Sequence, residues 1–142
     1  MFHELADTPG EHTPEELYER YEAELRTAIE TRGVDAVAAE SGVDETTIRA
    51  LLDGDASELT LQEGAAILAT LEDTPDADTI AVLSRDALLM GMTTAVLDVE
   101  AIESGVNGAL EAREIQSKVE GRFPMTLWEF ALLHQFIESR KR

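Results

Sequence analysis

The chain is 142 residues long, is 44% hydrophobic, and carries 30 acidic against 11 basic residues, a net charge of −19. The hydrophobic share argues against wholesale disorder, and the length predicts one domain or two very small ones. The absence of cysteine excludes disulfides, thiolate metal sites and a cysteine nucleophile. No uncharged apolar run approaches the ~20 residues of a membrane span, and the N-terminus lacks a basic, apolar signal. We therefore expect a soluble cytoplasmic protein.

The acidity is typical of a protein kept soluble in concentrated salt. Lys118 and Lys141 are the only lysines, whereas carboxylates are abundant. At molar ionic strength the Debye length falls to ~3 Å, which removes most of the self-repulsion and most of the repulsion from DNA. We therefore expect a halophilic source. The alternative is an acidic mesophilic protein that binds a basic partner.

The charge is uneven along the chain. Residues 1–75 hold 19 acidic and 4 basic side chains, while residues 112–142 hold six basic and four acidic ones. Contacts with an anionic partner are therefore expected from the C-terminal end.

Residues 1–12 contain Pro9 and Gly10 and no periodicity, which predicts a flexible tail. A helix then begins after Thr13, where Glu16 completes a capping box, and ends at Gly33. The pattern predicts further helices at 34–41, 44–53, 60–72 and about 77–97, with a break at 72–76. The apolar stripe predicted to face inward on the last of these is Ile80, Leu83, Ala87, Met90 and Thr94.

Strict alternation of β-branched and aromatic residues with polar ones occurs nowhere, so the protein is predicted to be all-α. Two segments also repeat one another. In each, isoleucine stands six residues before glycine, and a threonine–glutamate capping box follows; the matched residues are Ile48, Gly54, Thr60 and Glu63 in the first, and Ile115, Gly121, Thr126 and Glu129 in the second. Upstream, residues 34–37 match 99–102.

We predict two tandem helix-turn-helix-like units, 13–74 and 75–142, packed into one compact body. A unit of ~60 residues is marginal alone, and stacking two buries what each leaves exposed. Chance similarity between capped amphipathic helices is the alternative.

The first unit resembles a known family. The residues that carry the resemblance, over about residues 16–71, are Val37, Ala38, Gly42, Asp44, Ile48, Leu51 and Gly54. Their spacing is similar to that of the phage-repressor-type (lambda-repressor-like) helix-turn-helix family, and the second unit matches in its latter part. The whole chain also resembles a family of small acidic haloarchaeal proteins of unknown function.

The resemblance implies that helix 44–53 would contact the DNA groove, but its first turn carries Asp44 and Glu45. DNA affinity normally depends on Lys and Arg at the phosphates. The equivalent helix of the second unit, about 111–120, is therefore the better candidate, since Gln pairs with adenine and Arg with guanine. The predicted DNA-binding residues are Arg113, Gln116, Ser117, Lys118, Arg122, Arg140, Lys141 and Arg142. The alternative for them is a solvated helix face and a frayed basic terminus.

The apolar and aromatic residues of 123–137 are predicted to be core, with a dimer seam as the alternative. His134 is placed at a packing boundary rather than as a catalytic base. No enzyme motif occurs, and no catalytic residue, metal, cofactor or small-molecule substrate is predicted.

The hypothesis is a non-enzymatic, DNA-associated transcriptional regulator that uses the second unit. The alternative is a protein–protein interaction module, or homodimerising adaptor, whose helix-turn-helix frame no longer binds DNA.

Overall fold

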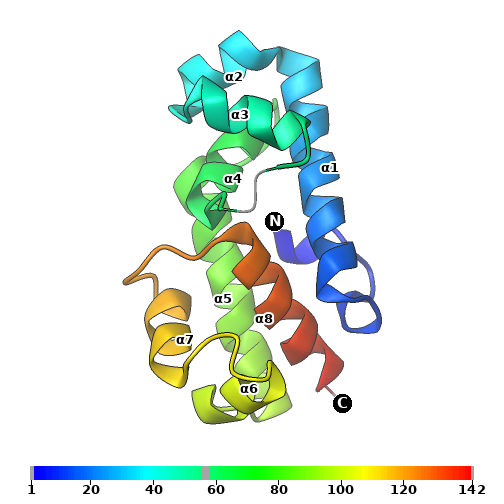
Figure 1. Cartoon of the computed structure of the whole chain (residues 1–142), viewed down its shortest axis with the longest axis vertical. Helices are drawn as coiled ribbons and strands as arrows, with labels where there is room; N and C mark the ends of the chain where they lie inside the picture. Colours follow the sequence, from blue (N-terminus) through cyan, green and yellow to red (C-terminus); the bar gives the residue numbers. More distant parts are fainter. Residues whose placement is uncertain (1, 56–57, 142) are drawn as a thin grey trace.

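The structure, a computed structural model, describes residues 2–55 and 58–141. These ranges form eight α-helices, two short 3-10 turns and no strand, which confirms the all-α prediction (Figure 1). Two 3-10 turns, η1 (Phe2–Glu4) and η2 (Pro9–Glu11), precede the first unit. This unit contains α1 (Pro14–Arg32), α2 (Val34–Ser41), α3 (Glu45–Leu52) and α4 (Leu61–Leu68). The second unit contains α5 (Ala77–Ala95), α6 (Val99–Gly105), α7 (Ala112–Val119) and α8 (Leu127–Ser139).

The two units repeat one order of helices: a long first helix, two short ones and a last helix. Helices α2 and α6 begin at the matched residues Val34 and Val99, and the matched Ile48 and Ile115 are both fully buried. Each long helix packs on the last helix of its own unit and on that of the other, so that α1 contacts α8 and α5 contacts α4. This exchange of contacts makes the two units one body.

The units also meet through their backbones where α4 and α8 begin. Thr60 and Thr126 each form a complete capping box with the glutamate three residues later, as predicted. The residue after each threonine donates its N–H to the carbonyl oxygen of the residue before the other threonine, at 2.8 Å in both cases. Equivalent positions therefore bind each other reciprocally, as a two-fold axis between the units requires.

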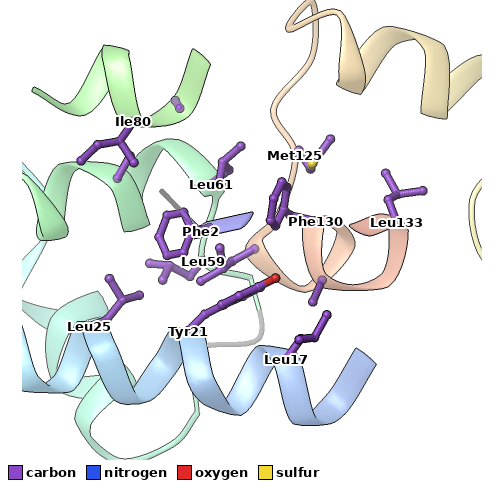
Figure 2. Packing of buried hydrophobic residues seen from close by; sticks show 14 of the residues in the cluster. Phe2, Leu17, Tyr21, Leu25, Leu59, Leu61, Ile80, Met125, Phe130 and Leu133 are labelled. Atoms are coloured by element: carbon purple, nitrogen blue, oxygen red, sulfur yellow. The ribbon is translucent and has the colours of Figure 1, made fainter. Parts of the chain in front are cut away.

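The first residues belong to the core, in contrast to the flexible tail expected from the sequence. Phe2 is only 1% exposed, and its ring centroid lies 5.5 Å from that of Tyr21 and 6.4 Å from that of Phe130 (Figure 2). Gly64 makes room for it, because a Cβ there would lie 3.1 Å from the Phe2 ring. Hydrophobic periodicity could not predict the burial of Phe2, since this single ring lies outside any periodic apolar stripe.

The inward stripe predicted for α5 is wrong in part. Leu83, Met90 and Thr94 are exposed. The residues of α5 that are buried are Ile80, Ala81, Ser84, Leu88 and Gly91. A Cβ at Gly91 would lie 2.7 Å from Cγ2 of Ile137, so only glycine permits this approach of α5 to α8. Small residues therefore let α5 approach α8 closely at Gly91, while Ile80 and Leu88 supply the large buried side chains of the helix.

The core prediction for residues 123–137 is confirmed for most of them. The buried residues are Met125, Leu127, Phe130, Ala131, Leu133, His134, Phe136 and Ile137. Trp128 packs edge-on against Tyr18, with ring centroids 5.7 Å apart. Phe123 is the exception at 63% exposed. The aromatic residues of α8 therefore do not form an open dimer seam.

Replacing Phe2 by alanine is expected to lower the free energy of unfolding by about 3 kcal/mol, because it empties a site in the core. The matched control, Phe123→Ala, removes the same ring from an exposed position and should change stability by less than about 0.5 kcal/mol. Guanidinium unfolding followed by circular dichroism measures both. Equal effects would show that residues 2–11 do not pack as described.

His134 predicts a pH dependence of stability. Its ring stacks on Phe130 at 5.4 Å, and burial lowers the pKa of His134 to about 4, although the Glu138 carboxylate opposes the shift. An exposed histidine in the unfolded chain titrates near pH 6.5. The unfolded state therefore takes up the proton first, and stability falls as the pH drops from about 6.5 to about 4.

The total loss from this one group is about 3 kcal/mol. His134→Leu should lack this component, so the stability difference between wild type and variant should vary between pH 7 and pH 4. Unfolding titrations at a series of pH values measure it. Parallel pH profiles for the two proteins would contradict the assignment.

Candidate nucleic-acid interface

Helix α7 is the predicted groove-contacting helix, and α6 and α7 lie at the opposite end of the long axis from α2 and α3 (Figure 1). Ile115 and Val119 are buried and hold α7 on the body. The connection between α6 and α7, residues 106–111, is longer than the connection between α2 and α3, residues 42–44. It contains two residues with positive φ, Asn107 and Gly108, whereas the shorter connection has a left-handed residue at Gly42. The longer turn is one feature in which the two units differ in shape.

The outer side of α7 borders an open hollow of about 700 Å³. The charged residues that line it are Glu100, Glu103, Glu111, Arg113 and Arg122, accompanied by Gln116 and Ser117. Carboxylates of α6 therefore share this hollow with Arg113 of α7 and with Arg122, which follows the helix. A DNA phosphate entering this hollow would be repelled by three carboxylates and attracted by two guanidinium groups.

Three predicted residues occupy this side of α7 together: Arg113, Gln116 and Ser117. The Gln116 side-chain amide donates to the Glu120 carboxylate, and the Ser117 hydroxyl donates to the Arg113 carbonyl oxygen at 3.1 Å. Arg113 is exposed and makes no ion pair within the described residues. It is the one predicted residue on α7 whose charge is available to a ligand.

The Lys118 side chain is mostly buried and lies between carboxylates. Its side chain is 16% exposed, and its Nζ lies 2.6 Å from Glu129 Oε2 and 3.7 Å from Glu114. Glu129 also caps α8, so this pair joins α7 to the start of the last helix. Lys118 therefore contributes its charge to ion pairs that join α7 to the start of α8.

Arg122 and the C-terminal cations are also engaged. Arg122 pairs with Glu120 at 2.6 Å, Lys141 pairs with Glu138, and the Arg140 guanidinium lies 5.1 Å above the Phe136 ring. The end of α8 lies on the other side of α5 from α7, so Arg140 and Lys141 are not brought to the α7 face (Figure 1). Arg142 lies outside the described residues.

The first unit offers less to DNA. Arg49 is the only basic residue of α3, and its Nε donates to the Glu45 carboxylate at 3.0 Å. Asp44 occupies the N-cap position but its side chain makes no capping hydrogen bond. The exposed first turn of α3 is therefore acidic, as the sequence analysis expected.

A family model described as a family of unknown function (DUF5791) matches residues 17–140. The chain belongs to this family. No curated protein and no solved structure matches the chain. The resemblance to phage repressors and the halophilic source stay predictions. Within the described residues, no single helix is long and apolar enough to cross a membrane.

The sequence analysis missed an exposed apolar surface on α5. The large apolar side chains exposed in the described part of the chain are Val82, Leu83, Leu89, Met90, Val96 and Phe123. All but Phe123 lie on α5 or at its C-cap. We call Val82, Leu83, Asp86, Leu89 and Met90 the α5 outer face; Asp86 is its only charged residue. The signal in the sequence is an apolar pair that recurs after seven residues, at 82–83 and 89–90, which is two helical turns.

The end of α5 is strained where this surface stops. Val96 is 88% exposed and adopts a left-handed conformation, with φ of 56°. For a β-branched residue this conformation is a genuine outlier. Val96 is therefore an exposed apolar residue that neither burial nor its backbone conformation favours.

Proposed function

We propose that the protein is a non-enzymatic protein–protein interaction module whose binding surface is the α5 outer face. The observation that carries the proposal is the exposure of four large apolar side chains on one helix of a chain with net charge −19: Val82, Leu83, Leu89 and Met90. Contiguous exposed apolar surface of this kind marks interaction sites in soluble proteins. Met90 is 70% exposed although its flexible side chain packs easily in cores.

The state of the basic residues supports the same proposal. Contacts with DNA phosphates require free Lys and Arg side chains, because they replace the counterions around DNA. In this protein Lys118, Arg122 and Arg49 are each bound to a carboxylate. Among the predicted DNA-binding cations of α7 and Arg122, Arg113 is thus the one whose charge is not paired within the described residues, whereas DNA binding normally uses several.

A DNA-associated transcriptional regulator is the second candidate function, and Arg113 favours it. This arginine is exposed and has no ion pair within the described residues, and Gln116 follows it by about one helical turn. These two side-chain types are suited to guanine and adenine edges. Molar salt would weaken the repulsion by the carboxylates of α6.

Titration of fluorescent genomic duplex fragments separates the two candidates. In potassium chloride from low to molar concentration, we expect wild type to raise the anisotropy no more than Arg113→Glu combined with Gln116→Ala. Lys118 and Arg122 are each bound to a carboxylate, which leaves Arg113 as a single available cation on this face. The charge-matched control is Arg20→Glu, which makes the same change of charge at an exposed position of α1. Binding that survives in the control and is lost in the double variant would establish the DNA candidate instead.

The interaction surface is tested directly by placing a photo-crosslinking amino acid at position 90, and at Glu19 as the exposed control. In an extract of the source cells, position 90 should give a discrete cross-linked protein species and position 19 none. Excess unlabelled wild type should compete for that species, whereas excess Leu83→Lys should not, because it disrupts the apolar patch. Equal competition by both would refute the role of the α5 outer face.

A further inference from the structure

We propose that the α5 outer face binds a second copy of this chain, with the two α5 helices antiparallel about a two-fold axis at Asp86. The inference rests on the proposed function, because it names the occupant of the same surface. Its basis is the placement of the four apolar residues, which is symmetric about Asp86. Leu83 and Leu89 stand three residues from it, and Val82 and Met90 stand four residues from it.

Residues three and four apart are neighbours on a helix surface, so these side chains surround Asp86 as one patch. In an antiparallel pair with its axis at Asp86, each residue faces the one at the same distance on the other side of Asp86 in the second copy. Leu83 then faces Leu89 of the second copy, and Val82 faces Met90 of the second copy. All four apolar side chains of each copy obtain an apolar partner.

This pattern is the one that an isologous interface requires, because the same patch must complement itself. A different partner would not require the patch to be symmetric about one residue. Val82 and Met90 are also a short and a long side chain, and Met adapts to the space left beside a smaller partner. Thr79 and Thr93, which stand seven residues from Asp86 on either side, are exposed, small and uncharged. Exposed Asp78 lies at the edge of the patch, where its carboxylate accepts a hydrogen bond from Gln62.

The charge distribution limits where two copies can meet. Two copies with net charge −19 repel each other, so they can meet only where carboxylates are sparse. Helix α1 shows the contrast, since its exposed residues include Glu15, Glu16, Glu19, Glu24 and Glu30. The α5 outer face has a single carboxylate, Asp86, which the symmetry places opposite its counterpart.

The Asp86 pair gives the association a distinctive salt dependence. Two carboxylates on the axis oppose the dimer, and salt screens both this pair and the repulsion between whole chains. The dimer should therefore tighten as potassium chloride is raised. A basic partner held by Asp86 would instead be released by salt, so the sign of the dependence separates the two occupants.

Sedimentation equilibrium of the full chain across potassium chloride concentrations tests the proposal. Wild type should show a monomer–dimer equilibrium that tightens with salt. Asp86→Asn should tighten it further at low salt, by roughly fivefold, since it removes the like-charge pair. Leu83→Lys should weaken it by at least about tenfold, because each copy loses a buried leucine.

Two further variants complete the design. Met90→Lys replaces the more exposed residue and guards against a folding defect in Leu83→Lys; it should weaken the dimer as well. Phe123→Lys adds the same charge at the exposed aromatic residue outside the patch and should leave the association unchanged. Guanidinium unfolding establishes that each variant is folded.

A wild-type protein that is monomeric at every salt concentration overturns the proposal, as does a dimer that Leu83→Lys and Met90→Lys do not weaken. A monomer that still gives the competed cross-link from position 90 means that the second copy is wrong while the interaction module stands. Arg113-dependent DNA binding without that cross-link means that the proposed function itself is wrong.

Discussion

The close approach of α5 to α8 determines which side of α5 faces solvent. Gly91 meets Ile137 where no side chain would fit, and Ala81 and Ser84 are buried on the same helix. This contact fixes which side of α5 faces the core, where Ile80 and Leu88 are buried beside the small residues. Val82, Leu83, Leu89 and Met90 lie on the outer side of the helix and are exposed. The exposed apolar residues of α5 are in this sense a consequence of how the helix packs on its neighbour.

The two units use one frame with different electrostatics. In both, a short helix is anchored by a buried isoleucine and presents its first turn outward. On α3 the single arginine is bound by a glutamate one turn earlier, and on α7 the lysine is drawn to the start of α8. The second unit therefore engages part of its basic charge in internal ion pairs, while Arg113 stays exposed. The net charge of the unit alone would not have shown this.

Local signals predicted much of the fold. The threonine–glutamate capping boxes at Thr13, Thr60 and Thr126 locate three helix starts, because each is defined within four residues. The repeat likewise predicted the matched starts of α2 and α6. Phe2 could not be placed in the core, since its partners, Tyr21 and Phe130, are remote in the sequence.

The candidate site was less predictable for related reasons. Helix α5 carries apolar residues on two sides, and periodicity does not say which side faces inward when both qualify. The deciding information is the steric fit of Gly91 against another helix. The role of Lys118 likewise depends on Glu129, eleven residues away, which only the packing of α7 on α8 brings within reach. Four of the eight predicted DNA-binding residues lie on α7, and of these four only Arg113 is exposed and makes no ion pair within the described residues.

The reciprocal hydrogen bonds beside Thr60 and Thr126 have a consequence for how this chain can change over time. They join equivalent points, as in a pair of identical subunits, yet both points belong to one polypeptide. In a true pair of subunits every substitution is made twice, whereas here each half can vary by itself. Helix α8 is longer than α4, and the turn before α7 is longer than the turn before α3. The two halves thus differ in these elements, while the hydrogen bonds beside Thr60 and Thr126 remain symmetric.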